Sequence, residues 1–307
     1  MVAVPSVAPV GLVHADAGAV LEALPPRCIQ LAVLDPPYYR MVDEPWDRQW
    51  ESEEDYVQWV GGWIDPLCAA LRTDGSTYLF GTPRMAAKLG TMLLEPRLEH
   101  RSTITWVKRD GFSAPRTTYA RSQEQILYYA ASAAAPFHRD AIREPYRSTK
   151  RIRAATRTGI PKDGRRWFPN PKGRLATDVW EFTSQRHLEK VHGRTVRPPH
   201  ATIKPTALIG RIVAASSDVG GLVLDPFAGS GTTAVVAAPM SRPTVLCEKE
   251  ERYLPLIRQR LAALPKPPEV LEVGPRRSEL RSLIGELLEA GGDDGHTPPL
   301  PGATEAG

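Results

Sequence analysis

Cysteine is scarce in this chain, and its scarcity excludes whole classes of protein. Of 307 residues only Cys28, Cys68 and Cys247 are cysteines, and no two of them stand in a CxxC spacing. A sparse, odd-numbered set of this kind argues against a disulfide framework and against a zinc site. We therefore expect all three to be small, buried apolar residues. The seven histidines are scattered as well, so we predict no bound metal ion.

Long apolar runs are missing too. No uninterrupted apolar stretch approaches the roughly 18 residues that a membrane-spanning helix requires. Hydrophobic residues make up 42% of the chain and charged residues 24%, which is typical of a soluble protein. Residues 1–10 are apolar but carry no basic leader, so we expect no signal peptide and a cytoplasmic location. The length suffices for one large α/β domain with a smaller inserted or appended one.

Positive charge gathers in one part of the chain. The net charge is only +4, yet residues 139–174 hold twelve Lys or Arg against three acids, with Phe137, Tyr146, Trp167 and Phe168 in or beside them. This balance indicates a polyanion as partner. The alternative is a solvated, partly disordered loop. The basic residues that we single out for phosphate contacts are Arg147, Lys150, Arg151, Arg153, Arg157, Arg165 and Arg166.

Elsewhere the apolar residues alternate between strand and helix spacing. This alternation predicts an α/β fold with a doubly wound, mainly parallel sheet covered on both faces. Two runs without a helix between them, 101–107 and 124–130, predict an antiparallel pair at one edge. The other expected strands are 11–16, 30–34, 77–80, 222–225 and 244–248, and the expected helices are 17–24, 53–71, 84–94, 205–216, 231–238, 250–263 and 278–289.

The first chemical motif follows the apolar run 31–34. It reads Asp35-Pro36-Pro37-Tyr38, and a carboxylate beside a backbone carbonyl can accept two hydrogen bonds from an exocyclic amino group. The prolines restrict the turn so that both acceptors point one way, and Tyr38 offers a ring on which a base can stack. The alternative interpretation is an ordinary strand-ending turn, since Asp and Pro are common turn formers.

The second motif follows the apolar run 222–224. It reads Asp225-Pro226-Phe227-Ala228-Gly229-Ser230-Gly231-Thr232-Thr233, and its glycines allow a tight strand-to-helix turn and close approach of a ligand. Such a pattern is weak evidence alone. Glu248 ends the next expected strand, where a carboxylate can accept both hydroxyls of a ribose. The spacing departs from GxGxxG, which disfavours a dinucleotide.

Together and in this order, the two motifs resemble the amino-methylating DNA methyltransferases of the permuted beta group. That group places the catalytic motif first, the cofactor motif last and the DNA-reading segment between them. The element His200-Ala201-Thr202-Ile203-Lys204-Pro205 is similar to the family's His-Pro-Thr-x-Lys-Pro, with Ala201 in place of proline. Asp16 stands where the family has an acid that binds the cofactor's adenine, and Asp178-Val179-Trp180 is also similar.

The resemblance implies a circularly permuted methyltransferase fold and S-adenosylmethionine as the cofactor. Four segments follow from it: a catalytic half at 1–130, a target-recognition segment at 131–178, a cofactor-binding half at 179–264, and a C-terminal helix with a disordered tail at 265–307. Asp35, Pro36, Pro37 and Tyr38 become the catalytic set. The implied cofactor contacts are Asp16, Lys204 at the methionine carboxylate, Asp225, Phe227, Gly229, Gly231, Thr232 and Glu248.

The implied activity is methylation of adenine N6 in duplex DNA, because Asp at the first motif position is typical of the adenine enzymes. Cytosine-N4 methylation is the alternative within the family, and the absence of any Pro-Cys dipeptide disfavours cytosine-C5 chemistry. Methylation of RNA or protein is disfavoured, because related enzymes of that kind place the glycine motif first. A catalytically silent DNA-binding module is the alternative of another class. We expect a monomer or homodimer, and a restriction endonuclease is a compatible partner.

Overall fold

A nine-stranded sheet forms the centre of the protein in the computed structural model, which describes residues 7–41, 43–108, 116–183, 189–191, 194–196 and 203–292. Its strands are β1 (Val10–His14), β2 (Ile29–Leu34), β3 (Leu71–Gly81), β4 (Glu99–Val107), β5 (Gln123–Ala130), β8 (Val179–Glu181), β11 (Val223–Asp225), β12 (Thr244–Glu248) and β13 (Val270–Val273). Their order is β13-β1-β12-β11-β2-β3-β5-β4-β8. Within this sheet only β5 runs antiparallel to its neighbours, so the predicted mainly parallel sheet is confirmed.

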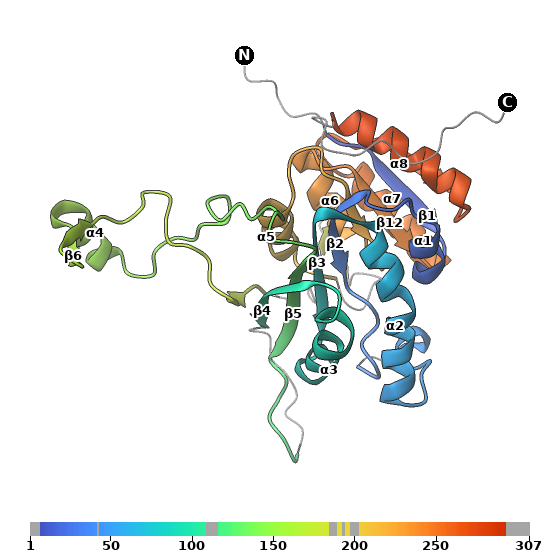
Figure 1. Cartoon of the computed structure of the whole chain (residues 1–307), viewed down its shortest axis with the longest axis horizontal. Helices are drawn as coiled ribbons and strands as arrows, with labels where there is room; N and C mark the ends of the chain where they lie inside the picture. Colours follow the sequence, from blue (N-terminus) through green and yellow to red (C-terminus); the bar gives the residue numbers. More distant parts are fainter. Residues whose placement is uncertain are drawn as a thin grey trace.

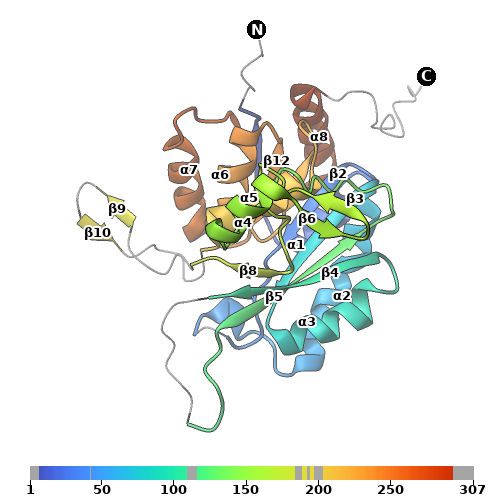
Figure 2. The ribbon, with the colours of Figure 1, turned by 90° about the vertical axis from the view of Figure 1, so that its left-hand side faces the viewer.

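Helices cover both faces of the sheet (Figures 1 and 2). The core on one face includes side chains of α1 (Ala17–Ala23), α2 (Glu53–Ala70), α3 (Pro83–Leu89) and α8 (Arg277–Gly291). The cores on the other face include those of α5 (Thr206–Ser216), α6 (Thr232–Ala237) and α7 (Leu254–Ala262). None of the helices in the described part of the chain is long and apolar enough to cross a membrane.

Local sequence explains the elements that carry the first motif. All six residues of β2 are buried, because a parallel strand with helices on both faces has no solvent-exposed side. Farther along, Ser52 and Asp55 form a reciprocal capping box that starts α2, and such a box satisfies backbone N–H groups that a helix start leaves free. Buried Tyr56, Trp63 and Ile64 then fix α2 against the sheet.

The segment predicted for target recognition forms an arm. Figure 1 shows α4 (Thr149–Thr158) and the hairpin of β6 (Ile160–Lys162) and β7 (Arg165–Trp167) well away from the central sheet. The arm is fixed at its base by Glu144, which pairs with Arg174 and, at 2.8 Å, with Arg211 on α5. The chain rejoins the sheet at β8, next to the predicted boundary at residue 178. After β8, a second hairpin pairs β9 (Glu189–Val191) with β10 (Arg194–Val196).

The edges of the sheet correct two expectations. The antiparallel pair β4–β5 forms as predicted, but it does not end the sheet, because β8 lies outside it and pairs in parallel with β4. At the other edge β13 pairs with β1, in a stretch where the sequence predicts only a helix. Three apolar residues and one acid are too few to display a strand period.

Several boundaries also differ. The helix predicted at 84–94 divides into α3 and a π-helical turn over Gly90–Leu94. The helix predicted at 250–263 begins with a 3-10 turn at Glu251–Tyr253, and Pro255 lies in the first turn of α7, where proline is tolerated. Gly291 ends α8 instead of beginning a tail, and the rest of the predicted tail, 293–307, lies outside the described residues. Cys28 and Cys247 are buried as expected, whereas Cys68 is only partly buried.

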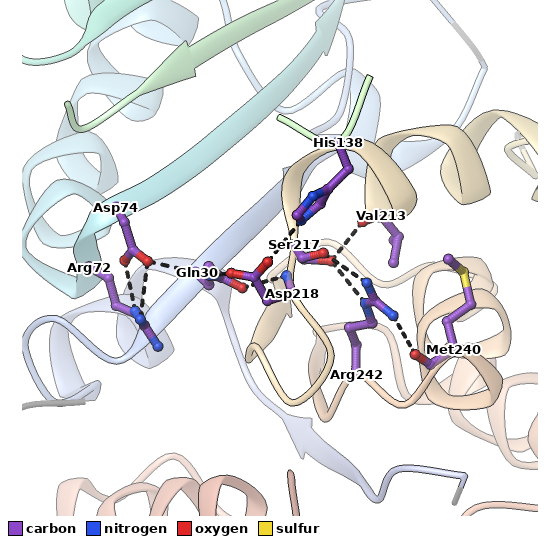
Figure 3. Close-up of polar contacts among 9 residues, drawn as sticks. All are labelled: Gln30, Arg72, Asp74, His138, Val213, Ser217, Asp218, Met240 and Arg242. Atoms are coloured by element: carbon purple, nitrogen blue, oxygen red, sulfur yellow. Dashed lines mark hydrogen bonds and ion pairs between the residues drawn. The ribbon is translucent and has the colours of Figure 1, made fainter. Parts of the chain in front are cut away.

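A polar network closes the end of the sheet where β2 begins. Figure 3 shows the Gln30 side chain between Asp74 and Asp218. Gln30 Nε2 donates to Asp218 Oδ2 at 2.7 Å, and its Oε1 accepts from the Asp218 backbone N–H at 2.9 Å. His138 Nε2 lies 2.8 Å from Asp218 Oδ1, and Arg72 pairs with Asp74. This end therefore connects residues from the two halves of the sheet and from the base of the arm.

Candidate active site

The two sequence motifs meet at one cavity. The strand order reverses between β2 and β11, and ligands of open α/β sheets bind beyond the carboxyl ends of strands at such a point. A cavity of about 410 Å³ opens there, within the usual range of small-molecule sites. Gly231 lies outside its lining. The predicted residues that do line it are Asp16, Asp35, Pro36, Pro37, Tyr38, Lys204, Asp225, Phe227, Gly229, Thr232 and Glu248.

Asp35 follows β2 and is held by a lysine. Lys204 Nζ donates to Asp35 Oδ1 at 2.7 Å and to Oδ2 at 2.6 Å. The Lys204 side chain is only 9% exposed, so this ion pair is largely shielded from water. The resemblance places Lys204 at the cofactor's methionine carboxylate, whereas here the lysine binds the carboxylate of Asp35. The cofactor contact of Lys204 stays a prediction, and His200 to Thr202 lie outside the described residues.

Glu124 is a second buried acid in the cavity, and the sequence analysis missed it. The Tyr38 hydroxyl donates to Glu124 Oε2 at 3.1 Å, Lys108 pairs with Oε1, and Lys204 Nζ lies 3.9 Å from Oε2. Glu124 reaches the cavity because β5 is antiparallel, so the first residues of β5 lie at the carboxyl ends of the parallel strands. A lone glutamate at the start of a strand carries no local pattern that could have revealed this position.

The pKa values of Asp35 and Glu124 are shifted in opposite directions. Burial raises the pKa of Asp35 above its usual range, although Lys204 opposes the shift. Burial also favours the neutral form of Glu124, but Lys204 and Lys108 outweigh it and lower the pKa of that carboxyl. Burial alone would lower the pKa of Lys204, and Asp35 and Glu124 together raise it. A charged lysine therefore lies between a firmly ionised glutamate and a more readily protonated aspartate.

The second motif forms the other half of the cavity. Asp225 Oδ1 accepts a hydrogen bond from the Phe227 backbone N–H at 3.1 Å, and Oδ2 accepts one from the Thr233 hydroxyl. These two hydrogen bonds stabilise the turn of the second motif. Burial raises the pKa of Asp225 to about 7, because the two hydrogen bonds only partly offset the loss of solvation.

Both glycines of the turn adopt left-handed backbone conformations. Gly229 has φ 52° and Gly231 has φ 73°, a region that side chains with a Cβ rarely occupy. A Cβ on Gly231 would also lie 3.0 Å from Ile257 Cγ2. Glu248 Oε2 accepts the Gly229 N–H at 2.6 Å, and Oε1 accepts the Glu250 N–H at 2.8 Å. The carboxylate of Glu248 is therefore oriented by the backbone on both sides.

Asp16 and the basic arm complete the predicted set. Asp16 caps α1 by accepting the Gly18 N–H at 3.0 Å, and Lys249 lies 3.2 Å from its other oxygen. The seven basic residues predicted to contact DNA are all exposed. Arg147 Nη2 lies 3.8 Å from Glu181 Oε1. Four of the seven lie on α4, namely Lys150, Arg151, Arg153 and Arg157. Two more, Arg165 and Arg166, lie on β7.

An α/β fold with a cavity where the strand order reverses is typical of enzymes that bind an adenosine-containing cofactor. The family model described as DNA methylase, of the N6 and N4 methyltransferase type, matches residues 29–259, and the chain therefore belongs to this family. A curated relative, the type II methyltransferase M1.MboII of Moraxella bovis, is 43% identical over 234 residues, which cover 76% of this chain and 89% of the relative.

Solved structures agree on the fold. The PvuII DNA methyltransferase, described as cytosine-N4-specific, matches with a TM-score of 0.62 at 12% identity, over 93% of this chain and 94% of its own. A putative DNA modification methylase of Thermus thermophilus, complexed with S-adenosyl-L-methionine, gives 0.53 at 21% identity, over 85% and 97%. At these identities the likeness shows the α/β fold alone. Membership of the DNA methylase family confirms S-adenosylmethionine as the predicted cofactor.

The residues of the cavity fit this cofactor. A carboxylate held by two backbone N–H groups, Glu248, suits the ribose hydroxyls. Asp16 lies in the same lining and offers an acceptor for the adenine amino group. Asp35 lines the same cavity as these residues. Among the described residues, no three His, Cys, Asp or Glu side chains gather as metal ligands.

Proposed function

We propose that this protein is a site-specific DNA methyltransferase that transfers a methyl group from S-adenosylmethionine to N6 of adenine in duplex DNA. The observation that carries the proposal is the position of Asp35-Pro36-Pro37-Tyr38 in the wall of the cofactor cavity. The first residue of this motif is Asp, as is typical of adenine-modifying members of the resembled group. The bound cofactor supplies an electrophilic methyl group on a sulfonium.

The side chains around Asp35 suit attack by an exocyclic nitrogen. The lone pair of such a nitrogen is delocalised into the ring, so the enzyme has to make it available. Asp35 and the Pro36 carbonyl can both accept from the amino group, and Asp35 then stabilises the positive charge that develops on nitrogen. The Asp35 side chain is only 21% exposed, so a base has to leave the duplex to reach it. Tyr38 offers a ring for that base to stack on.

Cytosine-N4 methylation is the second candidate. Its support is the family model, which covers N6 and N4 methyltransferases alike, and its target nitrogen is also an exocyclic amine on a six-membered ring. The experiment that decides is incubation of unmethylated plasmid DNA with the protein and labelled S-adenosylmethionine. Nuclease digestion and mass spectrometry then identify the modified base, and single-molecule sequencing reports its context. Detection of N6-methyladenine supports the proposal, and detection of N4-methylcytosine instead supports the second candidate. If no labelled methyl group is incorporated into the DNA, both candidates are refuted.

The partners belong to the same proposal. The relative M1.MboII is a type II methyltransferase, a name that supports a restriction endonuclease with the same target as partner. We propose that the exposed basic residues of the arm contact DNA phosphates, which position a protein without specifying sequence. Residues 131–178 would then form the target-recognition segment, between a catalytic half at 1–130 and a cofactor half at 179–264. A cytoplasmic location and a monomeric or homodimeric state complete the proposal.

A further inference from the structure

Asp35 is already engaged by a cation. Both of its oxygens accept hydrogen bonds from Lys204 Nζ, at 2.7 and 2.6 Å. An ammonium is a stronger donor to a carboxylate than a neutral amino group. The proposed function assigns the same carboxylate to the amino group of the target base. Lys204 and the substrate therefore compete for Asp35.

The competition is most unfavourable while the methyl group is being transferred. Positive charge then develops on the target nitrogen, and the carboxylate is useful because it stabilises that charge. A second cation bound to the same carboxylate repels the developing charge and weakens this stabilisation. Asp35 therefore acts best after Lys204 has moved away from it.

Burial limits where Lys204 can go. Its side chain is 9% exposed, and an ammonium that is buried without a partner is strongly disfavoured. Among the ion pairs of the described residues, its second partner is Glu124, with Nζ 3.9 Å from Oε2. A shift of about 1 Å would bring this pair to the usual distance of a charge-assisted hydrogen bond.

Glu124 is well placed to receive the lysine. Its Oε2 accepts the Tyr38 hydroxyl at 3.1 Å, and its Oε1 is paired with Lys108. These contacts fix the carboxylate beside the first motif. Lys204 and Lys108 keep the pKa of Glu124 low despite burial, so it stays ionised at neutral pH. The Tyr38 ring lies 5.1 Å from Nζ, which is within the range of a cation–π contact.

We propose that Glu124 is a positioning residue that takes over Lys204 when Asp35 binds the target amino group, an inference that rests on the proposed methyl transfer. The exchange breaks no covalent bond and moves no proton, because one ammonium passes from one carboxylate to its neighbour. Glu124 thereby frees Asp35 without exposing a buried charge. It also keeps the Tyr38 hydroxyl in place during the exchange.

The test compares Glu124→Gln with the double variant Glu124→Gln/Lys204→Met. Glutamine keeps the shape of Glu124 and an acceptor for Tyr38 but not the charge that attracts Lys204. We expect kcat on plasmid DNA, at saturating S-adenosylmethionine, to fall about 100-fold, with the dissociation constants of cofactor and DNA within about twofold. Removing the lysine as well should raise kcat at least about tenfold above that of Glu124→Gln when both variants are assayed at about pH 9, because burial raises the pKa of Asp35 and a higher pH favours its ionised form.

A structural role for Glu124 would not give that rescue. The matched control is Glu99→Gln, an exposed acid at the far end of β4, which should keep wild-type kcat. An active wild type with Glu124→Gln at the wild-type rate, or a double variant no faster than Glu124→Gln, overturns the inference alone. A wild type that transfers no methyl group to DNA overturns the proposed function and this inference with it.

Lys204→Met decides the question if Glu124→Gln does not fold. When Lys204 is a competitor for Asp35, its removal lowers kcat far less than the roughly 100-fold expected for Glu124→Gln, measured at the same pH and at saturating cofactor. KM for S-adenosylmethionine reports any cofactor contact of Lys204 separately. A fall in kcat of about 100-fold in this variant would show that the reaction needs Lys204 itself, and would overturn the exchange.

Discussion

At the scale of single residues, the two halves of the cavity should be separable by mutation. We expect Asp35→Ala to lower kcat by at least about 100-fold while the dissociation constant of S-adenosylmethionine stays within about twofold. Glu248→Ala should weaken cofactor binding by roughly 10- to 100-fold, since charge-assisted hydrogen bonds contribute about 1.5–3 kcal/mol. Methylation assays and calorimetry measure the two effects, and Asp65→Ala, an exposed acid on α2, should change neither. Turnover within twofold of wild type for Asp35→Ala would refute its role.

Asp225 should give stability a pH dependence of its own. Burial raises its pKa from 3.8 to about 7. The folded state therefore binds this proton more tightly than the unfolded chain, and the contribution of Asp225 to stability falls between about pH 4 and pH 7. Asp225→Asn cannot ionise, so its stability relative to wild type should rise across this interval by up to about 1.4 kcal/mol per pH unit. Urea denaturation at several pH values measures the difference, and a pH-independent difference would show an ordinary pKa.

At the scale of elements, the turn before α6 depends on glycine. Gly231→Ala would place a Cβ 3.0 Å from Ile257 Cγ2 at φ 73°, and such strain costs about 1–3 kcal/mol. We expect a lower melting temperature and weaker binding of S-adenosylmethionine. Gly285→Ala is the matched control, because no atom lies within 4 Å of its Cβ and alanine favours the interior of α8. Equal behaviour of the two alanine variants would contradict the strain.

The arm should determine how DNA binding responds to salt. If Arg165 and Arg166 on β7 both contact phosphates, replacing them with alanine should reduce the log–log salt slope of DNA affinity by about 0.9 per lost contact. Binding of S-adenosylmethionine should not change. Arg276→Ala/Arg281→Ala is the control of equal charge, at α8 on the other side of the molecule from the arm (Figure 1). Loss of sequence discrimination at an unchanged slope would instead indicate a guanine contact, and no change at all would show solvated side chains.

The same elements show what sequence can reveal. Both motifs could be recognised because each occupies consecutive residues behind a buried strand, and the order of the strands then brings Asp35 and Asp225 together. Glu124 could not, because it approaches Tyr38 only through the antiparallel pairing of β5 with β3. The ion pair of Lys204 with Asp35 was missed because it joins two residues that lie 169 positions apart in the sequence. The edge strands β8 and β13 are three and four residues long. Such short segments cannot display the alternation of apolar and polar residues that predicts a strand.

At the scale of the whole molecule, the cavity and the polar network around Gln30 lie at opposite ends of the sheet. The cavity lies beyond the carboxyl end of β2, whereas Gln30 begins the polar network at the other end (Figure 3). This network joins Asp74 from the catalytic half, His138 from the base of the arm and Asp218 from the cofactor half. The proposed segments are thus tied together where no ligand is expected to bind. Changes to the network should affect folding and leave the reaction intact.

Gln30→Leu tests this separation. Gln30 is 1% exposed, and leucine would remove its hydrogen bonds to the backbone N–H and the carboxylate of Asp218, which is half exposed and keeps its contact with His138. A hydrogen bond to a charged group contributes about 1.5–3 kcal/mol, and we expect the free energy of unfolding to fall by about that amount. The dissociation constant of S-adenosylmethionine and kcat should stay within about twofold of wild type below the melting transition. Gln259→Leu, an exposed glutamine on α7, should change stability by less than about 0.5 kcal/mol. If Gln30→Leu instead lowered kcat while the protein kept its wild-type stability, the network would have to influence the cavity through β2, and the separation of the two ends would be wrong.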